Sequence, residues 1–251
     1  MDKILIHCSQ CNKALSIPAN KHIKFNCPTC GKAHEYKNGT LIINSTSQTK
    51  TINKEPEYSS FIDNRDGKEY KTVKIGKQLW MAENLNFVGD NGFHREIKND
   101  NEWTNSDCYG WCYYDNKPGY GNIYGVLYQW EAAKWACPEG WHLPTDEEWD
   151  KLINFLGGKK VAGGKMKAKD TKYWKEPNQG ATNQSGFSAL SSGPRDDDGS
   201  FHYLGYYGWW WSATESSSND AYGRTLNNED AKVRRNPYDK PFGFSVRCVR
   251  D

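Results

Sequence analysis

Two pairs of cysteines near the start of the chain have the spacing of a metal site. Two residues separate Cys8 from Cys11 and Cys27 from Cys30, and fifteen residues lie between the pairs. This spacing lets both thiolates of a pair reach one ion, and two pairs complete a tetrahedral four-sulfur site. Thiolates are soft ligands, so the sequence predicts structural zinc and not calcium or magnesium.

The residues around these cysteines predict a small β-rich module over 1–43. Short apolar runs at 4–6, 14–17, 22–25 and 41–43 are typical of strands. A unit of this size would need the metal in order to fold, and it resembles a zinc ribbon. Two disulfides in a secreted domain are the alternative, which is disfavoured because the N-terminus shows no signal peptide.

A second set of residues raises the question of catalysis. Cys108 and Cys112 are four positions apart among aromatic residues and could form a redox pair. No histidine or basic residue adjoins them to lower a thiol pKa, so no catalytic residue is predicted. His142 is expected to be a core or capping residue, and His202 has no evident carboxylate partner in the sequence.

Three adjacent aspartates, Asp196 to Asp198, are followed by Gly199. Calcium loops place their carboxylates at alternate positions with a distant glutamate, whereas adjacent side chains point in different directions. A turn at the tip of a hairpin is therefore predicted here, and no calcium site.

The composition excludes several classes of protein. The 251 residues include 33 lysines and arginines and 31 aspartates and glutamates, so nucleic acid is not an expected partner. No apolar run approaches the roughly 18 residues of a membrane helix, and no membrane insertion is expected. Without a visible signal peptide, the expected location is the cytoplasm, with a virion or an injected cargo as the alternative.

The rest of the chain predicts a linker over 44–57 and a large domain over 58–251. All 11 tryptophans lie at or beyond Trp80, which indicates a folded domain with an aromatic core. Alternating residues at 70–75 and 78–81 predict a hairpin around Gly76 and Lys77.

Two helices are expected near the middle of the chain, between Tyr124 and Gly157. The first has an apolar stripe of Leu127, Trp130, Ala133 and Trp135, and the segment 137–140 ends it. The second begins with a capping box of Thr145 and Glu148 and ends at Gly157 and Gly158. Its predicted buried stripe is Trp149, Leu152, Ile153 and Leu156.

Strands are expected again toward the end of the chain. The candidates are 187–190, 209–212, 221–226, 231–235 and 242–249, with hairpin turns at Asp198-Gly199 and Asn227-Asn228. The segment 88–120 reads as a long loop. Central helices with antiparallel strands at both ends predict an α+β domain.

Several motifs carry a resemblance to a known family. They are YKTVKIGKQLWMAENL, YGVLYQWEAAKWACPEGWHLPTDEEWDKL, GFSALSSGPRDDDGSF, WWWSATE and GFSVRCVRD, in this order. Over about 58–251 the chain resembles the Fibrobacter succinogenes major paralogous domain, which is similar to C-type lectin and formylglycine-generating-enzyme-like folds.

The resemblance implies a C-type-lectin-like domain with two central helices and antiparallel strands. In such a domain the N- and C-terminal strands pair, and a loop-rich sheet presents a binding surface. A cysteine at the end of the first helix meets one in the last strand, and Cys137 and Cys248 match these positions. In a reducing compartment both would remain buried thiols.

The expected binding surface lies in 205–240, which is rich in residue types common in binding surfaces. The predicted ligand-binding residues are Trp209, Tyr222, Arg224, Asn227, Asn228, Arg234, Arg235 and Tyr238. The sequence therefore predicts a non-catalytic module that recognises a protein or a glycan through its C-terminal strands.

The resemblance also leaves three further possibilities. Some similar proteins are targets of diversity-generating retroelements, which vary exposed residues in the last strands. A structural or receptor-binding component of a phage particle or injection device is one alternative function. An oxidase of the formylglycine-generating type is the other.

Overall fold

The computed structural model describes residues 3–7, 13–18, 22–29, 33–37, 40–42, 56–89, 94–105, 107 and 109–251. The chain divides into two compact units, Met1–Ile52 and Asn53–Asp251. Each is described by itself below, as unit 1 and unit 2.

Unit 1 contains two small antiparallel sheets. Its strands are β1 (Lys3–His7), β2 (Ala14–Pro18), β3 (Ile23–Asn26), β4 (Ala33–Lys37) and β5 (Thr40–Ile42). Strand β1 pairs with β2, and β4 lies between β3 and β5. The sequence predicted four of these strands but missed β4. Leu15 and Cys27 are buried against Phe25, which is a small apolar core.

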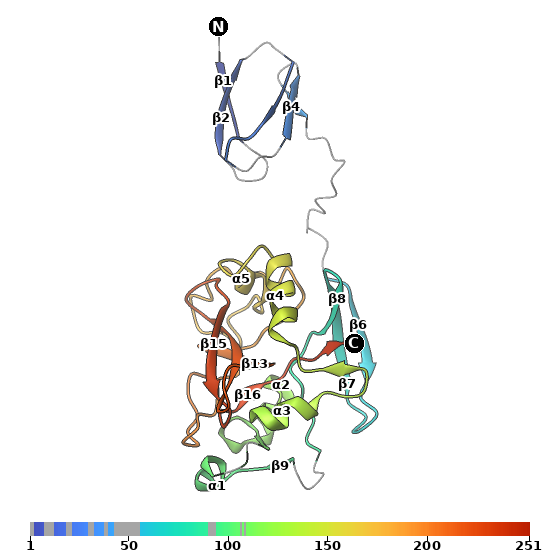
Figure 1. Cartoon of the computed structure of the whole chain (residues 1–251), viewed down its shortest axis with the longest axis vertical. Coiled ribbons are helices and arrows are strands. Elements are labelled where there is room, and N and C mark those ends of the chain that lie inside the picture. Colours follow the sequence, from blue (N-terminus) through green and yellow to red (C-terminus); the bar gives the residue numbers. More distant parts are fainter. Residues whose placement is uncertain are drawn as a thin grey trace. The chain divides into compact units, whose positions relative to one another are not determined.

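One sheet of unit 2 joins the beginning and the end of the domain (Figure 1). Its strand order is β12-β17-β8-β7-β6. The strands are β6 (Tyr58–Ile62), β7 (Glu69–Ile75), β8 (Gln78–Met81), β12 (Trp141–His142) and β17 (Val249–Arg250). The predicted hairpin around Gly76 is confirmed, and Val249 pairs with Trp80, as the resemblance implied.

The second sheet of unit 2 has the order β15-β14-β13-β16-β11-β10-β9. Its strands are β9 (Arg95–Glu96), β10 (Gly110–Cys112), β11 (Leu127–Tyr128), β13 (Tyr207–Glu215), β14 (Asp220–Asn227), β15 (Arg234–Asp239) and β16 (Phe244–Ser245). Antiparallel pairs dominate both sheets, so the predicted α+β class is confirmed.

The helices of unit 2 are short. They are α1 (Asp100–Thr104), the 3-10 helix η1 (Tyr114–Asn116), α2 (Pro118–Tyr124), α3 (Trp130–Ala136), α4 (Asp146–Phe155) and α5 (Ala162–Met166). Within the described residues, none of the helices is long and apolar enough to cross a membrane.

Helix α4 forms as the sequence predicted. Thr145 and Glu148 make both hydrogen bonds of a capping box. The stripe of Trp149, Leu152, Ile153 and Leu156 is buried. The helix ends where Gly157 adopts a φ of 102°, a left-handed conformation that glycine tolerates best.

Helix α3 is shorter than predicted. Gly125 has a φ of 77°, and the chain then enters β11, so Leu127 lies in a strand instead of a helix. Trp130 and Ala133 are buried, but Trp135 is 66% exposed. The prediction that Trp135 belongs to the buried stripe was therefore wrong, because Trp135 lies roughly 140° around the helix axis from Trp130, outside the stripe formed by the buried residues.

The predicted strands near the C-terminus need three corrections. The segment 187–190 contains only an isolated bridge between Ala189 and Lys167. The strand expected at 231–235 is β15, which begins three residues later, and the strand expected at 242–249 divides into β16 and β17.

The loop expected at 88–120 also needs correction, because this segment includes α1, β9 and β10.

Tryptophans form much of the core of unit 2. Trp210 and Trp211 point to opposite faces of β13, because successive side chains alternate along a strand. Trp210 packs in a cluster with Trp149, and Trp211 in another with Phe244. The Trp210 indole donates to Asn84 Oδ1 at 2.9 Å, so its polar group is satisfied.

His142 lies at the corner between α3 and α4. Its Nδ1 contacts the Asp251 carboxylate, and its Nε2 lies 2.9 Å from Glu148 Oε1. Burial alone would lower the pKa of His142, but the hydrogen bonds to Asp251 and Glu148 outweigh burial and raise it. His142 caps neither helix itself, but it holds Glu148, which caps α4, and so it links the corner between the two helices.

This contact predicts a pH-dependent contribution to stability. Folding raises the pKa of His142, so protonated His142 stabilises the folded state. This stabilisation is fully present at pH values below the pKa of His142 in the unfolded chain. It is lost as the pH rises through the pKa of His142 in the folded protein. Urea unfolding of wild type and His142→Gln should differ most near pH 5.5, by about 1 kcal/mol at most. A difference that grows toward pH 8 would contradict the assignment.

Candidate functional site

The strand register divides the predicted ligand-binding residues between two faces of one sheet. Trp210 pairs with Arg224, and Arg224 pairs with Arg235. Opposed residues share a face, so Arg224 and Arg235 lie on the side of the sheet that faces α4. Trp209, Thr225 and Arg234 are opposed in the same way and lie on the other side.

On the α4 side, the predicted residues are tied to the helix. Arg224 is 1% exposed, and its Nη1 lies 2.6 Å from Asp146 Oδ1 at the start of α4. Its Nη2 lies 3.1 Å from Asp150. Arg235 also contacts Asp146, and its guanidinium lies 3.3 Å from the centre of the Tyr222 ring. These contacts join the sheet to the helix N-terminus, where negative charge is favoured.

Arg224 is therefore expected to matter for stability. Arg224→Met should lower the free energy of unfolding by about 3 kcal/mol, because it removes the buried one of the two cations that hold the partly buried Asp146. The matched variant Arg234→Met should change it by less than about 1 kcal/mol, since Arg234 is only half-buried. Urea unfolding followed by tryptophan fluorescence measures both. Equal effects of the two variants would be inconsistent with this role.

On the other side of the sheet, aromatic rings form a continuous row. We call it the aromatic face, and its members are Tyr203, Tyr207, Trp209, Tyr238, Phe242 and Phe244. The rings of Tyr207 and Trp209 are stacked with centres 5.0 Å apart, and those of Tyr238 and Phe244 meet edge to face at 5.0 Å. Phe244 is buried, whereas Tyr207, Tyr238 and Phe242 are half-buried.

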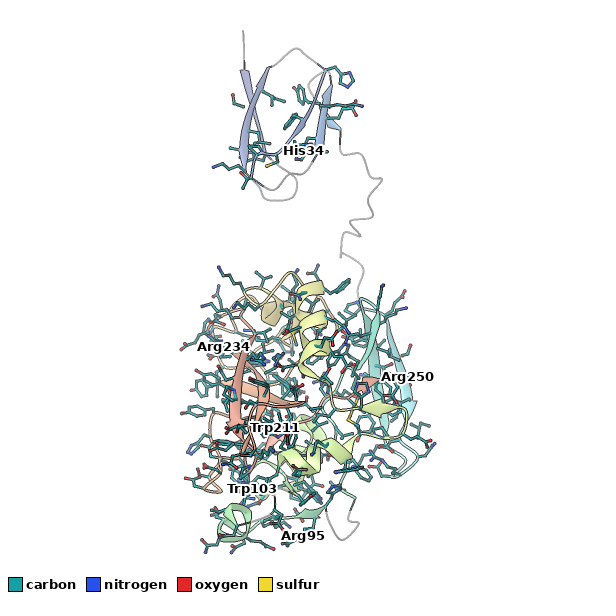
Figure 2. The ribbon with its side chains drawn as sticks, in the orientation of Figure 1. His34, Arg95, Trp103, Trp211, Arg234 and Arg250 are labelled. Carbon is teal, nitrogen blue, oxygen red and sulfur yellow. A yellow bond between two sulfur atoms is a disulfide. The ribbon has the colours of Figure 1, made fainter. Side chains whose placement is uncertain are left out.

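Hydrogen bonds fix the position of Tyr238 within the aromatic face. Its hydroxyl lies 2.8 Å from Thr225 Oγ1 and accepts from the Trp209 indole at 3.3 Å. Asn236, which is exposed, donates to the same hydroxyl at 3.4 Å. Arg234 lies on the outer edge of the domain, whereas Trp211 lies in its interior (Figure 2). Polar groups therefore border the aromatic face along strand β15.

Tyr203 extends the aromatic face beyond the strands. Its ring is 56% exposed and lies 5.4 Å from that of Tyr207. Its φ is 58°, a left-handed conformation that is uncommon for an aromatic residue. Such conformations cluster at binding sites because only function or strong packing retains them.

The remaining two predicted residues lie at the end of β14, with Asn227 as its last residue and Asn228 directly after it. Asn227 and Asn228 are each 4% exposed. The Asn228 amide donates to the Glu176 carbonyl at 2.8 Å, and Asn227 Oδ1 accepts from the Asp230 amide at 3.1 Å. Both asparagines therefore hold the turn together. Of the eight predicted residues, the structure leaves Arg235 exposed and Tyr222, Arg234 and Tyr238 partly exposed, on two different faces.

Sequence reasoning missed Tyr203, Tyr207 and Phe242 as members of the aromatic face. The available signal was the run of tyrosines around Gly205, but only the strand register shows which of them lie beside Trp209.

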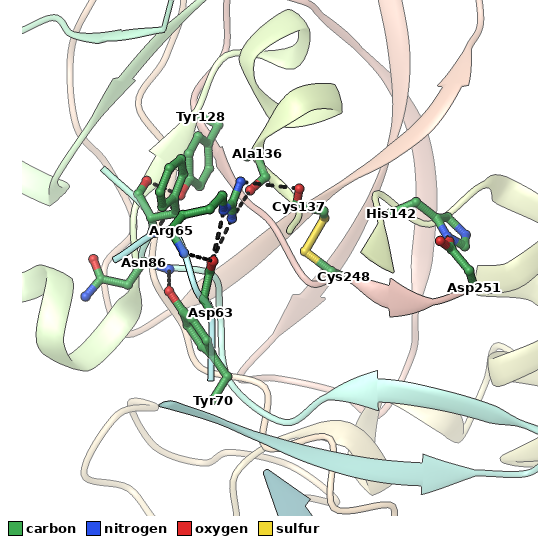
Figure 3. The surroundings of a disulfide bond; sticks show 11 residues. Asp63, Arg65, Tyr70, Asn86, Tyr128, Ala136, Cys137, His142, Cys248 and Asp251 are labelled. Atoms are coloured by element: carbon green, nitrogen blue, oxygen red, sulfur yellow. Dashed lines mark hydrogen bonds and ion pairs between the residues drawn. A yellow bond between two sulfur atoms is a disulfide. The ribbon is translucent and has the colours of Figure 1, made fainter. Parts of the chain in front are cut away.

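A disulfide lies on the side of unit 2 near the β6–β7 hairpin (Figure 3). It joins Cys137, directly after α3, to Cys248, directly before β17. Arg65 from the hairpin donates to the carbonyls of Ala136 at 2.8 Å and Cys137 at 3.3 Å. These bonds satisfy carbonyls at the end of α3 that lack a helical partner.

Asp63 holds Arg65 in place. The guanidinium Nη2 lies 2.7 Å from Asp63 Oδ2, and Asp63 is 1% exposed. Burial alone would raise the pKa of Asp63, but its hydrogen bonds with Arg65 outweigh burial and lower it.

Cys112 is buried in β10. Burial raises the pKa of its thiol to about 12, although the nearby Arg195 acts in the opposite direction. A reactive cysteine needs a lowered pKa and access to solvent, and Cys112 has neither. The other member of the suspected redox pair, Cys108, lies outside the described residues.

The structure shows the partner of His202 and the conformation of the aspartate-rich segment. His202 Nε2 lies 3.6 Å from Asp196 Oδ2, so the expectation that it has no carboxylate partner was wrong. Asp198 accepts hydrogen bonds from Ser200 in the turn predicted at this position.

In the described part of the chain, no three His, Cys, Asp or Glu side chains are grouped to hold a metal. Three of the four predicted zinc ligands, Cys8, Cys11 and Cys30, lie outside that part.

Comparison with known families gives one match. The model of the Fibrobacter succinogenes major domain matches residues 73–250, which include β8, the helices, the aromatic face and both cysteines of the disulfide. No curated protein and no solved structure matches the chain.

Proposed function

Because the chain belongs to the Fibrobacter succinogenes major domain family, we propose that unit 2 is a non-catalytic binding module on a C-type-lectin-like scaffold. Two features support the scaffold. The last strand, β17, pairs with β8 near the start of the domain. The disulfide also joins the end of a central helix to the segment before the last strand.

The single observation that carries the binding function is the aromatic face. Tyr203, Tyr207 and Tyr238 present partly exposed rings in one continuous row over Trp209. Tyrosine and tryptophan provide large contact area at low entropic cost, and they are enriched where binding energy concentrates. A polar border at Arg234 completes the usual pattern of an apolar centre and a polar rim.

Of the two ligand classes that the sequence left open, the aromatic face fits a protein better. Its rings line a sheet surface that extends over the four neighbouring strands β15, β14, β13 and β16, which suits the broad contact of a protein partner. The oxidase alternative is disfavoured, because Cys112, the described member of the suspected redox pair, is buried with a raised thiol pKa.

The experiment is a crosslinking capture from the native host followed by measurement with the purified partner. Tyr238→Ala and Tyr203→Ala should each weaken binding by about 1 to 3 kcal/mol, as expected for residues at the centre of an interface. Tyr206→Ala is the matched control, since Tyr206 is 47% exposed but makes no ring contact with the aromatic face in the described structure. Equal loss in all three variants would refute the assignment to this face.

We also propose that unit 1 is a zinc ribbon in which Cys8, Cys11, Cys27 and Cys30 bind one structural zinc ion. The strand bounds support this proposal, because the first pair falls between β1 and β2 and the second between β3 and β4. Both pairs of strands are antiparallel, so each cysteine pair occupies the connection of a hairpin. Cys27 is 1% exposed, which suits a ligand of a closed structural site.

A further inference from the structure

Unit 2 has a cleft that the proposed function does not use. Its volume is about 590 Å³, within the range of small-molecule binding sites. The cleft lies where the β6–β7 hairpin, the segment after β8, helix α2 and the loop that contains Tyr173 and Ser188 meet. Strands β6 and β7 lie on the other side of the domain from β15 (Figure 1).

The polar groups of the cleft offer both donors and acceptors. Lys71, Glu83 and Asn122 are exposed side chains on three different elements that line it. An ammonium group only donates, a carboxylate only accepts, and an amide does both. The wall also contains Asn86, whose Oδ1 is buried without a hydrogen-bond partner in the described structure.

The charges of the lining cancel. Lys68 and Lys71 contribute two positive charges, and Glu69 and Glu83 contribute two negative charges. Lys68 is also paired with Asp66 at 3.3 Å. A site for phosphate or for a dicarboxylate would need a positive excess, so the lining favours a neutral ligand.

Two partly exposed tyrosines, Tyr58 and Tyr173, contribute apolar surface to the lining of the cleft. Tyr58 is 44% exposed, and its hydroxyl lies 3.3 Å from Ser188 Oγ on the opposite wall. Tyr173 is half-buried and meets Tyr124 edge to face. Because the Lys172 ammonium lies over the Tyr173 ring, 4.9 Å from its centre, Tyr58 supplies the more open ring, beside a hydroxyl group that can donate and accept.

From these observations, we infer that the cleft binds a short neutral oligosaccharide. Sugar hydroxyls both donate and accept, which matches the mixture of ammonium, carboxylate and amide groups. The C–H faces of a pyranose ring match the tyrosine rings, and an uncharged sugar needs no excess of either charge. A purely apolar ligand would leave Lys71, Glu83 and Asn122 without new partners while removing their water.

The inference is tested by calorimetry on the full chain with cellotriose, xylotriose, mannotriose and chitotriose at millimolar concentration, and with 3′-sialyllactose as a charged comparison. At least one neutral trisaccharide should bind, and Tyr58→Ala and Asn122→Ala should each weaken that binding by about tenfold or more. Both side chains are exposed, so these variants should retain the wild-type tryptophan fluorescence.

Tyr206→Ala again serves as the matched control, because it removes an exposed tyrosine that does not line the cleft. It should leave sugar binding unchanged. Three results would overturn the inference: no binding of any neutral trisaccharide, tighter binding of sialyllactose, or binding that survives both cleft variants. Since the aromatic face is not tested here, none of these results decides the proposed function.

Discussion

Reduction of the disulfide between Cys137 and Cys248 is expected to lower the free energy of unfolding of unit 2 by about 4 kcal/mol. The two cysteines are 111 residues apart in the chain. A crosslink across a loop of this length removes a large part of the conformational freedom of the unfolded chain, and the chain-entropy relation gives about 4 to 5 kcal/mol. The effect should appear as a lower urea midpoint in the presence of a reductant.

Tryptophan fluorescence reports this transition for unit 2 alone, because every tryptophan lies at or beyond Trp80. The double variant Cys137→Ala/Cys248→Ala should be as unstable as the reduced wild type and should not respond to reductant. Cys112→Ala should still respond, since the Cys112 thiol is not part of the crosslink. A wild-type midpoint that is independent of reductant would show that the crosslink contributes no stability.

The elements that could be predicted from the sequence are those whose signals are local. Helix α4 has its cap, its apolar stripe and its terminating glycine within fourteen residues, Thr145 to Gly158, and all three signals are borne out. The β7–β8 hairpin has its turn at Gly76 between two alternating runs. In both cases short-range physics and the final fold favour the same conformation.

The elements that could not be predicted depend on contacts between distant segments. Arg224 belongs to a residue type that is common in interfaces, but its partners Asp146 and Asp150 are 78 and 74 residues away in the chain. A single sequence does not show that these carboxylates meet the guanidinium. The same holds for α3, because the helix begins only at Trp130, and which of its sides is buried depends on the segments that pack against it; Trp135 lies on the other side.

The aromatic face and the cleft also depend on contacts between distant segments of the chain. Trp209 and Tyr238 could be selected by type, but their contact depends on the pairing of three strands and on the hydrogen bond between indole and hydroxyl. The cleft was missed entirely, because Tyr58, Asn122 and Tyr173 come from separate segments with no motif in common. Register and tertiary packing, which sequence periodicity does not specify, therefore determine both surfaces.

Removal of zinc is the second large effect that we expect, and it should be confined to unit 1. The described buried apolar residues of that unit are few: Leu15, Ile17, Cys27 and Tyr36, with Phe25 packed against Leu15 and Cys27. Burial on this scale is too small to offset the conformational entropy of folding, and very small domains usually depend on metals or disulfides. Structural zinc contributes about 10 to 16 kcal/mol of apparent binding free energy in zinc-finger peptides, which is enough to decide whether such a unit folds.

The measurement is chelation of the full chain, with metal release followed by a zinc-sensitive dye and the structure of unit 1 followed by NMR. One zinc ion per chain should be released, and the amide signals of β1 to β5 should collapse toward random-coil positions. Tryptophan fluorescence should stay constant, because unit 1 contains no tryptophan. Cys27→Ser should reproduce the loss without chelator, whereas Cys112→Ser should not. If β1 to β5 persist after complete chelation, or if the purified chain holds no zinc, the four cysteines do not form a structural zinc site.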